Sequence, residues 1–309
     1  MRRLRIAIIG FGKIAADQHV PAIAGNKRFE LAATVNRHGN GPAPCFTSHG
    51  ELLAAGLELD AVAIATPPGA RYEIASDCIA AGLHVLLEKP PSVTLSEIAD
   101  LACLAEGAQL SLFASWHAQH NGAVAAAARA LAGKRIASME VVWHEDVRKW
   151  HPGQDWIFEA GGFGVFDPGI NAFSILATIF PGSLFVREAV LTYPANRQAP
   201  IAAEIGFSSP VADGPLTCSL DWRCAEGEQW TIAVRTADGM ALELSEGGKR
   251  LATDGQEPAS DGRGEYPDIY DRFVDLIDTR RSRVDATPLR LVADALLVGT
   301  RETTQAFED

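Results

Sequence analysis

The most constraining feature of the sequence is a glycine-containing turn between an apolar segment and a helical one near the N-terminus. Residues 4–9 are apolar enough for a strand buried on both faces, and Gly10-Phe11-Gly12-Lys13-Ile14-Ala15 follows them. In this G-x-G-x-x-A spacing Gly10 permits a tight turn, Gly12 lets the backbone approach a pyrophosphate, and Ala15 allows close helix–strand packing. The segment therefore predicts a dinucleotide-binding turn, with an ordinary tight turn as the alternative.

The first third of the chain continues this alternation of strands and helices. Further β-rich segments cover residues 31–35, 61–65, 84–87 and 110–114, and helical segments begin near 14 and cover 72–81 and 95–106. Apolar strands that alternate with helices are typical of a doubly wound parallel sheet. We therefore predict an α/β fold with an N-terminal Rossmann domain over residues 1–120.

The pattern changes beyond residue 120, where strands follow one another with few helices between them. The expected strands are 136–145, 184–193, 202–207, 216–222, 229–236 and 240–245, and Ala237-Asp238-Gly239 has the turn residues of a hairpin. This predicts a C-terminal α+β domain over residues 121–309 with a largely antiparallel open sheet. One helix is expected over 169–179, and a last one over 289–307 is expected to pack back on the first domain.

Composition limits the partners of such a chain. Its 309 residues are 47% hydrophobic and 21% charged, with a formal net charge of −12. That charge opposes binding to nucleic acid or to an anionic membrane, and no apolar segment is long enough to span a bilayer. The five scattered cysteines lack Cys-x-x-Cys spacing, so neither a disulfide framework nor a metal site is indicated. We expect a cytoplasmic protein without a signal peptide, a nucleic-acid partner or a membrane partner.

The residues at the end of the second expected strand indicate which dinucleotide the chain prefers. An NAD-specific protein usually has an acidic residue here for the ribose hydroxyls, whereas this chain has Asn36, Arg37 and His38. A guanidinium suits a 2′-phosphate or stacks on adenine, so the sequence favours NADP with NAD tolerated. The alternative is that Arg37 is a solvated surface residue.

A motif after the fourth expected strand links the chain to a known family. The segment Glu88-Lys89-Pro90, together with the glycine turn, resembles the glucose-fructose oxidoreductase/inositol dehydrogenase (Gfo/Idh/MocA) family over essentially the whole chain. The resemblance implies that Lys89 points at the oxygen of the reacting carbon near the nicotinamide. It also implies that Thr66-Pro67 lies along the cofactor, while Arg71 replaces a histidine that is usual in the family.

The second domain departs from the family at one position. Most members have Asp-x-x-x-His after a glycine-rich segment, and here the residues are Asp167 and Asn171. The general acid/base must then be Lys89, Asp167 or both. The asparagine and the segment Trp150-His151-Pro152-Gly153-Gln154 resemble the branch that oxidises aldose sugars at C1, which implies L-arabinose, D-galactose or D-fucose as substrate and an aldonolactone as product.

Each candidate has a less specific interpretation. Asp167 before Pro168 fits a helix N-cap with proline at the first helical position, and the two roles are compatible. Glu145, His151 and Trp150 suit sugar recognition but also occur as loop or core residues. The remaining candidates are Asn171, His117 and Trp230, for which a surface or capping role, a satisfied core histidine and core packing are the respective alternatives.

The expected sites are therefore two sets. Residues expected to contact the cofactor are Gly10, Gly12, Lys13, Ile14, Ala15, Asn36, Arg37, His38, Thr66, Pro67, Glu88, Lys89, Trp116 and His117. Residues expected to contact the sugar are Lys89, His117, Glu145, Trp150, His151, Asp167, Asn171 and Trp230. The same fold also serves NAD-dependent glycoside hydrolases and cofactor-binding regulators of sugar genes, and the resemblance implies a homodimer through the C-terminal sheet.

Overall fold

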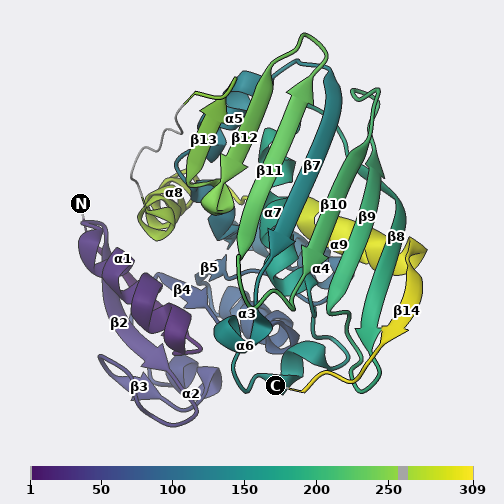
Figure 1. Cartoon of the computed structure of the whole chain (residues 1–309). Coiled ribbons are helices and arrows are strands. Elements are labelled where there is room, and N and C mark those ends of the chain that lie inside the picture. The colour runs from purple at the N-terminus through teal and green to yellow at the C-terminus, as the bar shows by residue number, and fades with distance from the viewer. Residues whose placement is uncertain (1, 257–263, 309) are drawn as a thin grey trace. The chain divides into compact units, whose positions relative to one another are not determined.

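A computed structural model describes residues 2–256 and 264–308, and the chain divides into two compact units (Figure 1). The first unit contains residues up to His117 together with the segment Gly264–Ala286. The second contains the residues from Ala118 that precede this segment and the residues from Thr287 onward. The first unit is therefore built from two separate stretches of sequence.

The first unit has a six-stranded sheet in which every pairing is parallel. Its strand order is β3-β2-β1-β4-β5-β6, so the direction of winding reverses between β1 and β4. This is the doubly wound sheet that the alternating sequence predicted. The strands are β1 (Leu4–Ile9), β2 (Phe29–Val35), β3 (Cys45–Phe46), β4 (Ala61–Ile64), β5 (His84–Leu87) and β6 (Leu112–Ala114).

Helical segments connect these strands. A π-helical turn, η1, precedes α1, and α4 begins with a capping box between Thr94 and Glu97 that satisfies two of the free amides at its start. The helical segments of this unit are η1 (Ala15–His19), α1 (Val20–Gly25), α2 (His49–Ala54), η2 (Pro68–Ala70), α3 (Arg71–Ala80), α4 (Leu95–Gly107) and α8 (Glu265–Thr279), and η3 (His117–His120) leads out of it.

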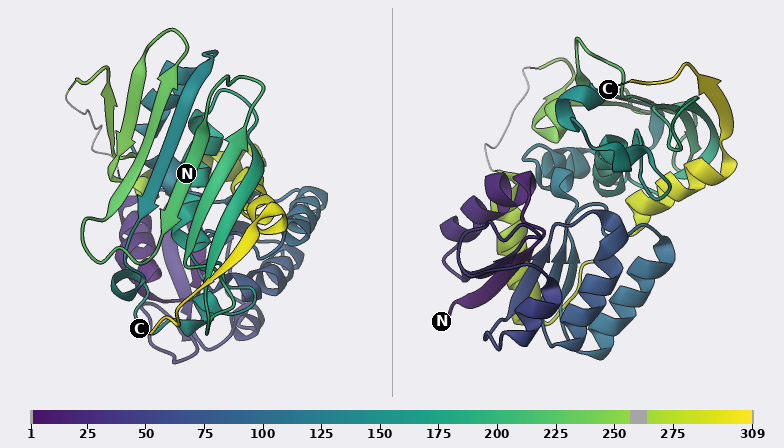
Figure 2. Two further views of the ribbon diagram at one scale, coloured as in Figure 1. Left: turned by 45° about the vertical axis from the view of Figure 1, so that its right-hand side comes forward. Right: turned by 90° about the horizontal axis from the view of Figure 1, so that it is seen from below.

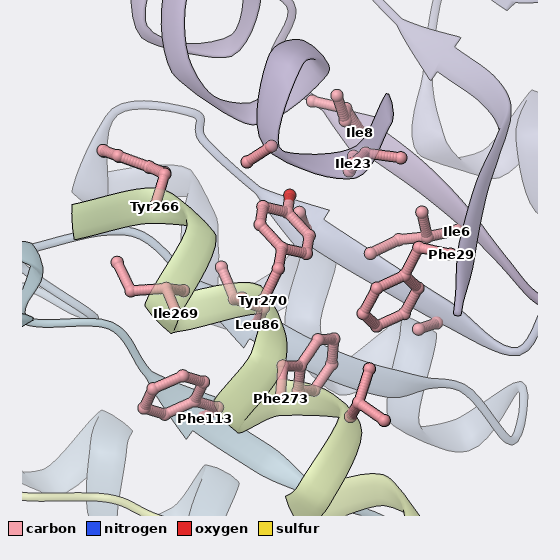
Figure 3. Packing of buried hydrophobic residues seen from close by; sticks show 14 of the residues in the cluster. Ile6, Ile8, Ile23, Phe29, Leu86, Phe113, Tyr266, Ile269, Tyr270 and Phe273 are labelled. Carbon is pink, nitrogen blue, oxygen red and sulfur yellow. The ribbon is translucent and has the colours of Figure 1, made fainter. Parts of the chain in front are cut away.

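Helix α8 completes the core of the first unit (Figure 3). Its Tyr270 and Phe273 pack on Phe29 with ring centroids 5.5 and 5.8 Å apart, and Phe273 also lies 6.3 Å from Phe113. Each of these four aromatic residues is at most 1% exposed. Burying an aromatic side chain stabilises a fold by about 1.5–3 kcal/mol, so this helix is a substantial part of the unit.

The expectation that the last helix, 289–307, packs back on the first domain was wrong. Helix α9 (Thr287–Val298) belongs to the second unit and ends before Gly299, and β14 (Thr300–Thr304) pairs with β8. Glycine weakens a helix and threonine favours a strand, which explains the early end. The segment that returns to the first unit is α8 instead.

The second unit is built on an eight-stranded sheet in which most pairings are antiparallel, as expected, although β13 and β14 were not among the six predicted strands. Only β7–β10 and β8–β14 are parallel among the pairings in the described sheet. The strand order is β13-β12-β11-β7-β10-β9-β8-β14. The strands are β7 (Ile136–His144), β8 (Phe185–Pro194), β9 (Ala202–Ser208), β10 (Leu216–Asp221), β11 (Gln229–Thr236), β12 (Ala241–Ser245), β13 (Arg250–Thr253) and β14.

Helices cover one face of this sheet (Figures 1 and 2). They are α5 (Val124–Leu131), α7 (Phe166–Ile179) and α9, and the short segments α6 (Val147–Trp150), η4 (Asp155–Phe158) and η5 (Glu246–Gly248) complete the unit. Among the described residues no helix is long and apolar enough to cross a membrane, and no three His, Cys, Asp or Glu side chains form a group suited to a metal ion.

Candidate active site

A cavity of about 600 Å³ lies at the carboxyl ends of β1, β2 and β4 in the first unit. These ends flank the point where the winding of the sheet reverses, which is where open α/β sheets bind ligands. Seven residues of the predicted cofactor set line it: Gly10, Gly12, Asn36, Arg37, His38, Thr66 and Pro67. The other lining residues are Ile9, Phe11, Val35, Thr47, Ser48, His49, Ala65, Ala70 and Ile74.

The two glycines of the turn have different physical roles. Gly10 has φ +93°, and a Cβ there would lie 2.6 Å from the backbone nitrogen of Thr66, so a side chain is excluded by both conformation and space. A Cβ at Gly12 would meet no heavy atom within 4 Å. Gly10 is thus required by the fold, whereas the open space at Gly12 is available to a ligand.

Asn36 holds the turn from the neighbouring strand. Its Nδ2 donates to the carbonyl of Phe11 over 2.7 Å, and its Oδ1 accepts from the amide of His38 over 2.9 Å. The side chain therefore stabilises the rim of the cavity. Arg37 and His38, which follow it, are exposed at that rim, and none of the described residues that line the cavity is acidic.

The cavity suits a phosphate-bearing dinucleotide. The hydroxyl of Thr66 is buried and has no partner among the described atoms, so a bound group would satisfy it. Cationic Arg37 at the rim and the space at Gly12 complement an anion. Gly10, Gly12, Arg37 and Thr66 are the residues that would hold such a cofactor.

Seven residues of the predicted cofactor set lie outside the lining of this cavity: Lys13, Ile14, Ala15, Glu88, Lys89, Trp116 and His117. Lys13 is exposed and pairs with Asp17, and Ile14 is exposed. Ala15 is fully buried in the core, which agrees with the packing role expected of it. Trp116 is also buried, and its indole donates to the carbonyl of Asp285 over 2.8 Å. Their contact with a cofactor stays a prediction.

Arg71 braces the loop that carries Lys89. The side chain is buried, and its guanidinium donates to the carbonyl of Thr66 over 2.8 Å and to the carbonyls of Glu88 and Pro90. The peptide bond between Lys89 and Pro90 is cis. The residue that replaces the usual histidine therefore ties the Thr66 turn to the Lys89 loop.

Glu88 is the centre of a buried polar network. Its Oε1 accepts from His19 Nε2 over 3.0 Å and from the Tyr266 hydroxyl over 2.8 Å, and its Oε2 accepts from the amide of Lys89 over 3.1 Å. Burial raises the pKa of Glu88, but the hydrogen bonds that it accepts from His19 and Tyr266 lower it, and the pKa lies at about 2. The carboxylate is therefore ionised at neutral pH.

Sequence reasoning missed most of that network. His19, Tyr266 and Tyr270 were not among the expected residues, and the two tyrosines were missed because α8 was not predicted. His117 was expected, and it lies beside the network: its Nδ1 is 3.0 Å from Glu265 Oε2, and its ring stacks on Tyr266. The amphipathic spacing of the apolar residues in α8 is the signal that would have revealed the helix.

Asp167 lies in the first turn of α7 in the second unit. The helix begins at Phe166 with Val165 at the N-cap, so the alternative that Asp167 is the N-cap was wrong. Asn171 follows one turn later on the same face, as the spacing predicted. Asp167 is buried, and its Oδ2 lies 3.4 Å from Nε2 of His151.

Two tryptophans hold the carboxylate of Glu145, which follows β7. The indole nitrogens of Trp222 and Trp230 donate to its Oε1 and Oε2 over 3.0 and 2.8 Å. The Trp222 ring also lies 5.3 Å from the His151 ring, so the Glu145 and Asp167 groups share one neighbourhood. Trp150 packs edge-on against Trp230 with centroids 5.9 Å apart. The structure thus brings Glu145, Trp150, His151, Asp167 and Trp230 together and adds Trp222, which was not among the candidates.

The strand order and the glycine turn at the switch point define a dinucleotide-binding α/β protein with a second, sheet-based unit. The profile of the oxidoreductase family with an NAD-binding Rossmann fold matches residues 4–115. The chain is 43% identical to a galactose 1-dehydrogenase of Pseudomonas fluorescens over 315 aligned positions that cover 100% of both proteins. The chain belongs to the Gfo/Idh/MocA family of oxidoreductases.

Solved structures agree with this assignment. A D-galactose-1-dehydrogenase from Rhizobium etli superposes with a TM-score of 0.94 at 48% identity and covers 100% of this chain and 99% of its own. A 3-ketoreductase from Actinomadura kijaniata, solved with NADP, has the same fold, with a TM-score of 0.80 at 17% identity over 98% of this chain and 100% of its own.

Proposed function

We propose that this oxidoreductase is an aldose 1-dehydrogenase that oxidises D-galactose, L-arabinose or D-fucose at C1 with NADP or NAD. The observation that carries the proposal is the cluster in the second unit, where Asp167, His151 and Glu145 lie among tryptophan side chains. Carboxylates and imidazoles bind sugar hydroxyls, and indole faces pack on sugar rings. Whole-length similarity to a galactose 1-dehydrogenase supports the choice of sugar.

Oxidation at C1 removes a hydride and a proton from the sugar. The hydrogen on C1 leaves with its electron pair, the anomeric hydroxyl loses a proton, and the C1–O1 bond becomes the carbonyl of an aldonolactone. When bound, a nicotinamide dinucleotide supplies the hydride acceptor. The chain supplies the proton acceptor, for which Asp167 and Lys89 are the candidates.

Asp167 is suited to accept a proton at its Oδ1 or Oδ2. It is buried, which strengthens its interactions, and His151 lies close enough to share a proton with it. Asn171, on the same face of α7, can orient a hydroxyl as donor or acceptor. We propose that Lys89 binds the oxygen on which charge develops and shares the proton.

We further propose that NADP is preferred. Arg37 and His38 at the rim of the cavity offer a cation and a ring nitrogen to a 2′-phosphate, and no described lining residue repels it. NAD lacks that phosphate, so it loses this contact but keeps the others. His49 at the same rim is paired with Asp77, which leaves Arg37 as the principal cation.

We propose a homodimer through the uncovered face of the second unit's sheet. A row of paired residues crosses five strands on that face without being buried: Thr231, Val142, Ser219, Glu204 and Val190. A sheet face with apolar residues and no helices over it is a typical interface. Sedimentation velocity would show a mass near twice that of the chain, and a monomer would overturn this.

We also propose a cytoplasmic location. The five free cysteines support it, because a reducing compartment keeps thiols unpaired.

The deciding experiment measures reduced nicotinamide with each sugar. The protein is supplied with NADP or NAD and with D-galactose, L-arabinose, D-fucose, D-glucose or myo-inositol, and absorbance of the reduced cofactor is followed. We expect reduction with the first three sugars, and its loss in Lys89→Ala and Asp167→Ala. The control variants are Lys27→Ala and Asp100→Ala, at exposed positions.

Failure of this experiment has a defined meaning. If the wild-type protein binds the cofactor but reduces none with any sugar, the dehydrogenase proposal is overturned. Release of sugar from a glycoside with no net reduction would then indicate a hydrolase, and binding without turnover would indicate a regulator. If activity survives in Asp167→Ala, the proton acceptor is not Asp167.

A further inference from the structure

His19 connects three parts of the first unit that are distant in sequence. It ends η1, the π-helical turn that follows the glycine turn, and its side chain is fully buried. Its Nε2 lies 3.0 Å from Glu88 after β5, and its Nδ1 lies 2.7 Å from the hydroxyl of Tyr270 on α8. π-Helical turns often occur where a helix must aim a side chain at a functional site.

One tautomer of His19 satisfies both contacts. With the proton on Nε2, the ring donates to the Glu88 carboxylate and its Nδ1 accepts from Tyr270. The pKa of the Tyr270 hydroxyl is well above its ordinary value because the group is buried near Glu88, so it remains a donor. A buried network in which every member is satisfied is rigid.

The network ends on the backbone of the residue that we assign to the chemistry. Glu88 uses Oε1 for His19 and Tyr266, and it uses Oε2 for the amide of Lys89. A carboxylate held on one side by two donors keeps its other oxygen in a fixed place. The orientation of the Lys89 backbone therefore depends on His19 and Tyr266, although both of these side chains donate to Glu88 and not to Lys89.

We propose that His19 is a positioning residue, which acts through Glu88 to fix the backbone of Lys89 and so links the glycine turn to the reacting end of the site. This inference rests on the dehydrogenase function proposed above. Misplacing a reacting group by about 1 Å can cost about 100-fold in rate. Loss of His19 should then lower kcat more than it raises KM.

The test uses three variants and one control. His19→Leu removes both hydrogen bonds, His19→Gln restores a donor toward Glu88, and Tyr266→Phe removes only the other donor. His84→Leu is the matched control, because His84 is a partly buried histidine at the opposite end of β5, where it accepts from the amide of Ser111. A general loss of stability would affect the control equally.

Kinetics give the first readout. We expect His19→Leu to lower kcat about 10- to 100-fold with KM for sugar and cofactor changed less than about threefold, and His19→Gln to recover part of the loss. The control should keep wild-type kcat. An unchanged kcat, or a rise in KM with kcat intact, would overturn the proposal.

Hydrogen exchange gives a second readout that does not need activity. Lys89 is followed by Pro90 and Pro91, which have no amide hydrogen, so a short peptide isolates the Lys89 amide. We expect faster exchange there in His19→Leu and Tyr266→Phe than in the control. If the wild-type protein oxidises no sugar, the proposed function fails, and hydrogen exchange alone tests the positioning role. Equal protection of the Lys89 amide in His19→Leu and in the wild type would then contradict that role.

Discussion

The imidazole of His151 lies against the carboxylate of Asp167, with 3.4 Å between Nε2 and Oδ2. The pair joins the loop after α6 to the first turn of α7, where a negative charge is favoured by the helix dipole. A buried carboxylate beside an imidazole can pass on a proton that it accepts. We therefore propose that Asp167 accepts the proton and that His151 passes it on, two roles that the sequence could not distinguish.

The first prediction concerns these two residues. Asp167→Asn keeps the shape but removes the proton acceptor, so kcat should fall by about 10²- to 10⁴-fold. His151→Gln should lower kcat less and raise KM for the sugar. Steady-state kinetics on both variants check this. Equal losses of kcat in the two variants would mean that Asp167 and His151 act as one unit, and would contradict the assignment of separate roles to them.

The two glycines of the turn offer a matched pair. Gly10→Ala places a Cβ 2.6 Å from Thr66 in a backbone conformation with φ +93°, so it should destabilise the protein by about 2 kcal/mol or more. Gly12→Ala meets no protein atom within 4 Å and should leave the free energy of unfolding nearly unchanged. Its methyl group should instead weaken cofactor binding. Urea unfolding and cofactor titration test the pair, and tight binding by Gly12→Ala would contradict it.

Arg37 should control the choice between cofactors. Arg37→Ala removes the exposed cation at the rim of the cavity, so the KM for NADP should rise about 10-fold while that for NAD changes little. Parallel kinetics with both cofactors measure the ratio. A similar rise in both values would place Arg37 on a part of the cofactor that NADP and NAD share.

Arg71 should contribute mainly to stability. Replacing it with Met leaves three carbonyls, two of them buried, without their charged donor, and the free energy of unfolding should fall by about 3 kcal/mol. Arg135→Met is the control, because Arg135 is exposed and pairs with Asp213. Denaturant unfolding compares the two variants. A loss in Arg71→Met no larger than in the control would contradict the bracing role.

Glu88 should make stability depend on pH in the acid range. Its pKa is lowered from the ordinary 4.5 to about 2, so between these values the unfolded chain binds a proton that the folded chain does not. Its contribution is therefore complete above pH 4.5 and is lost as the pH falls through about 2. Glu88→Gln should be less stable than wild type at pH 6, with the gap closing toward pH 2. A gap that stays constant with pH would disprove the assignment.

Much of the fold could be predicted because its signals are local. The strands β1, β5 and β11 begin and end where the apolar segments do, and parallel strands place their following turns at one edge of the sheet. For that reason Gly10, Asn36 and Thr66 were expected near one another and all line the cavity.

The rest could not be predicted because it depends on distant pairs. His19 and Glu88 are 69 residues apart, and Tyr266 and Glu88 are 178 apart. The periodic apolar residues of α8 identify a helix, but no local pattern states which unit it packs on. The hydrogen bonds from the indoles to Glu145 also depend on distant pairs, since Trp222 follows β10 and Trp230 lies in β11, and the order of these strands is set by the whole sheet.

The position of α8 in the chain has a consequence for synthesis. A ribosome translates β7 to β13 before it reaches Glu265, so the early strands emerge without the helix that covers Phe29 and Phe113. A chain that terminates before α8 leaves that apolar surface bare and prone to aggregate. The nucleotide-binding unit, although encoded first, is completed late, and a fragment ending at His117 should not be stable alone.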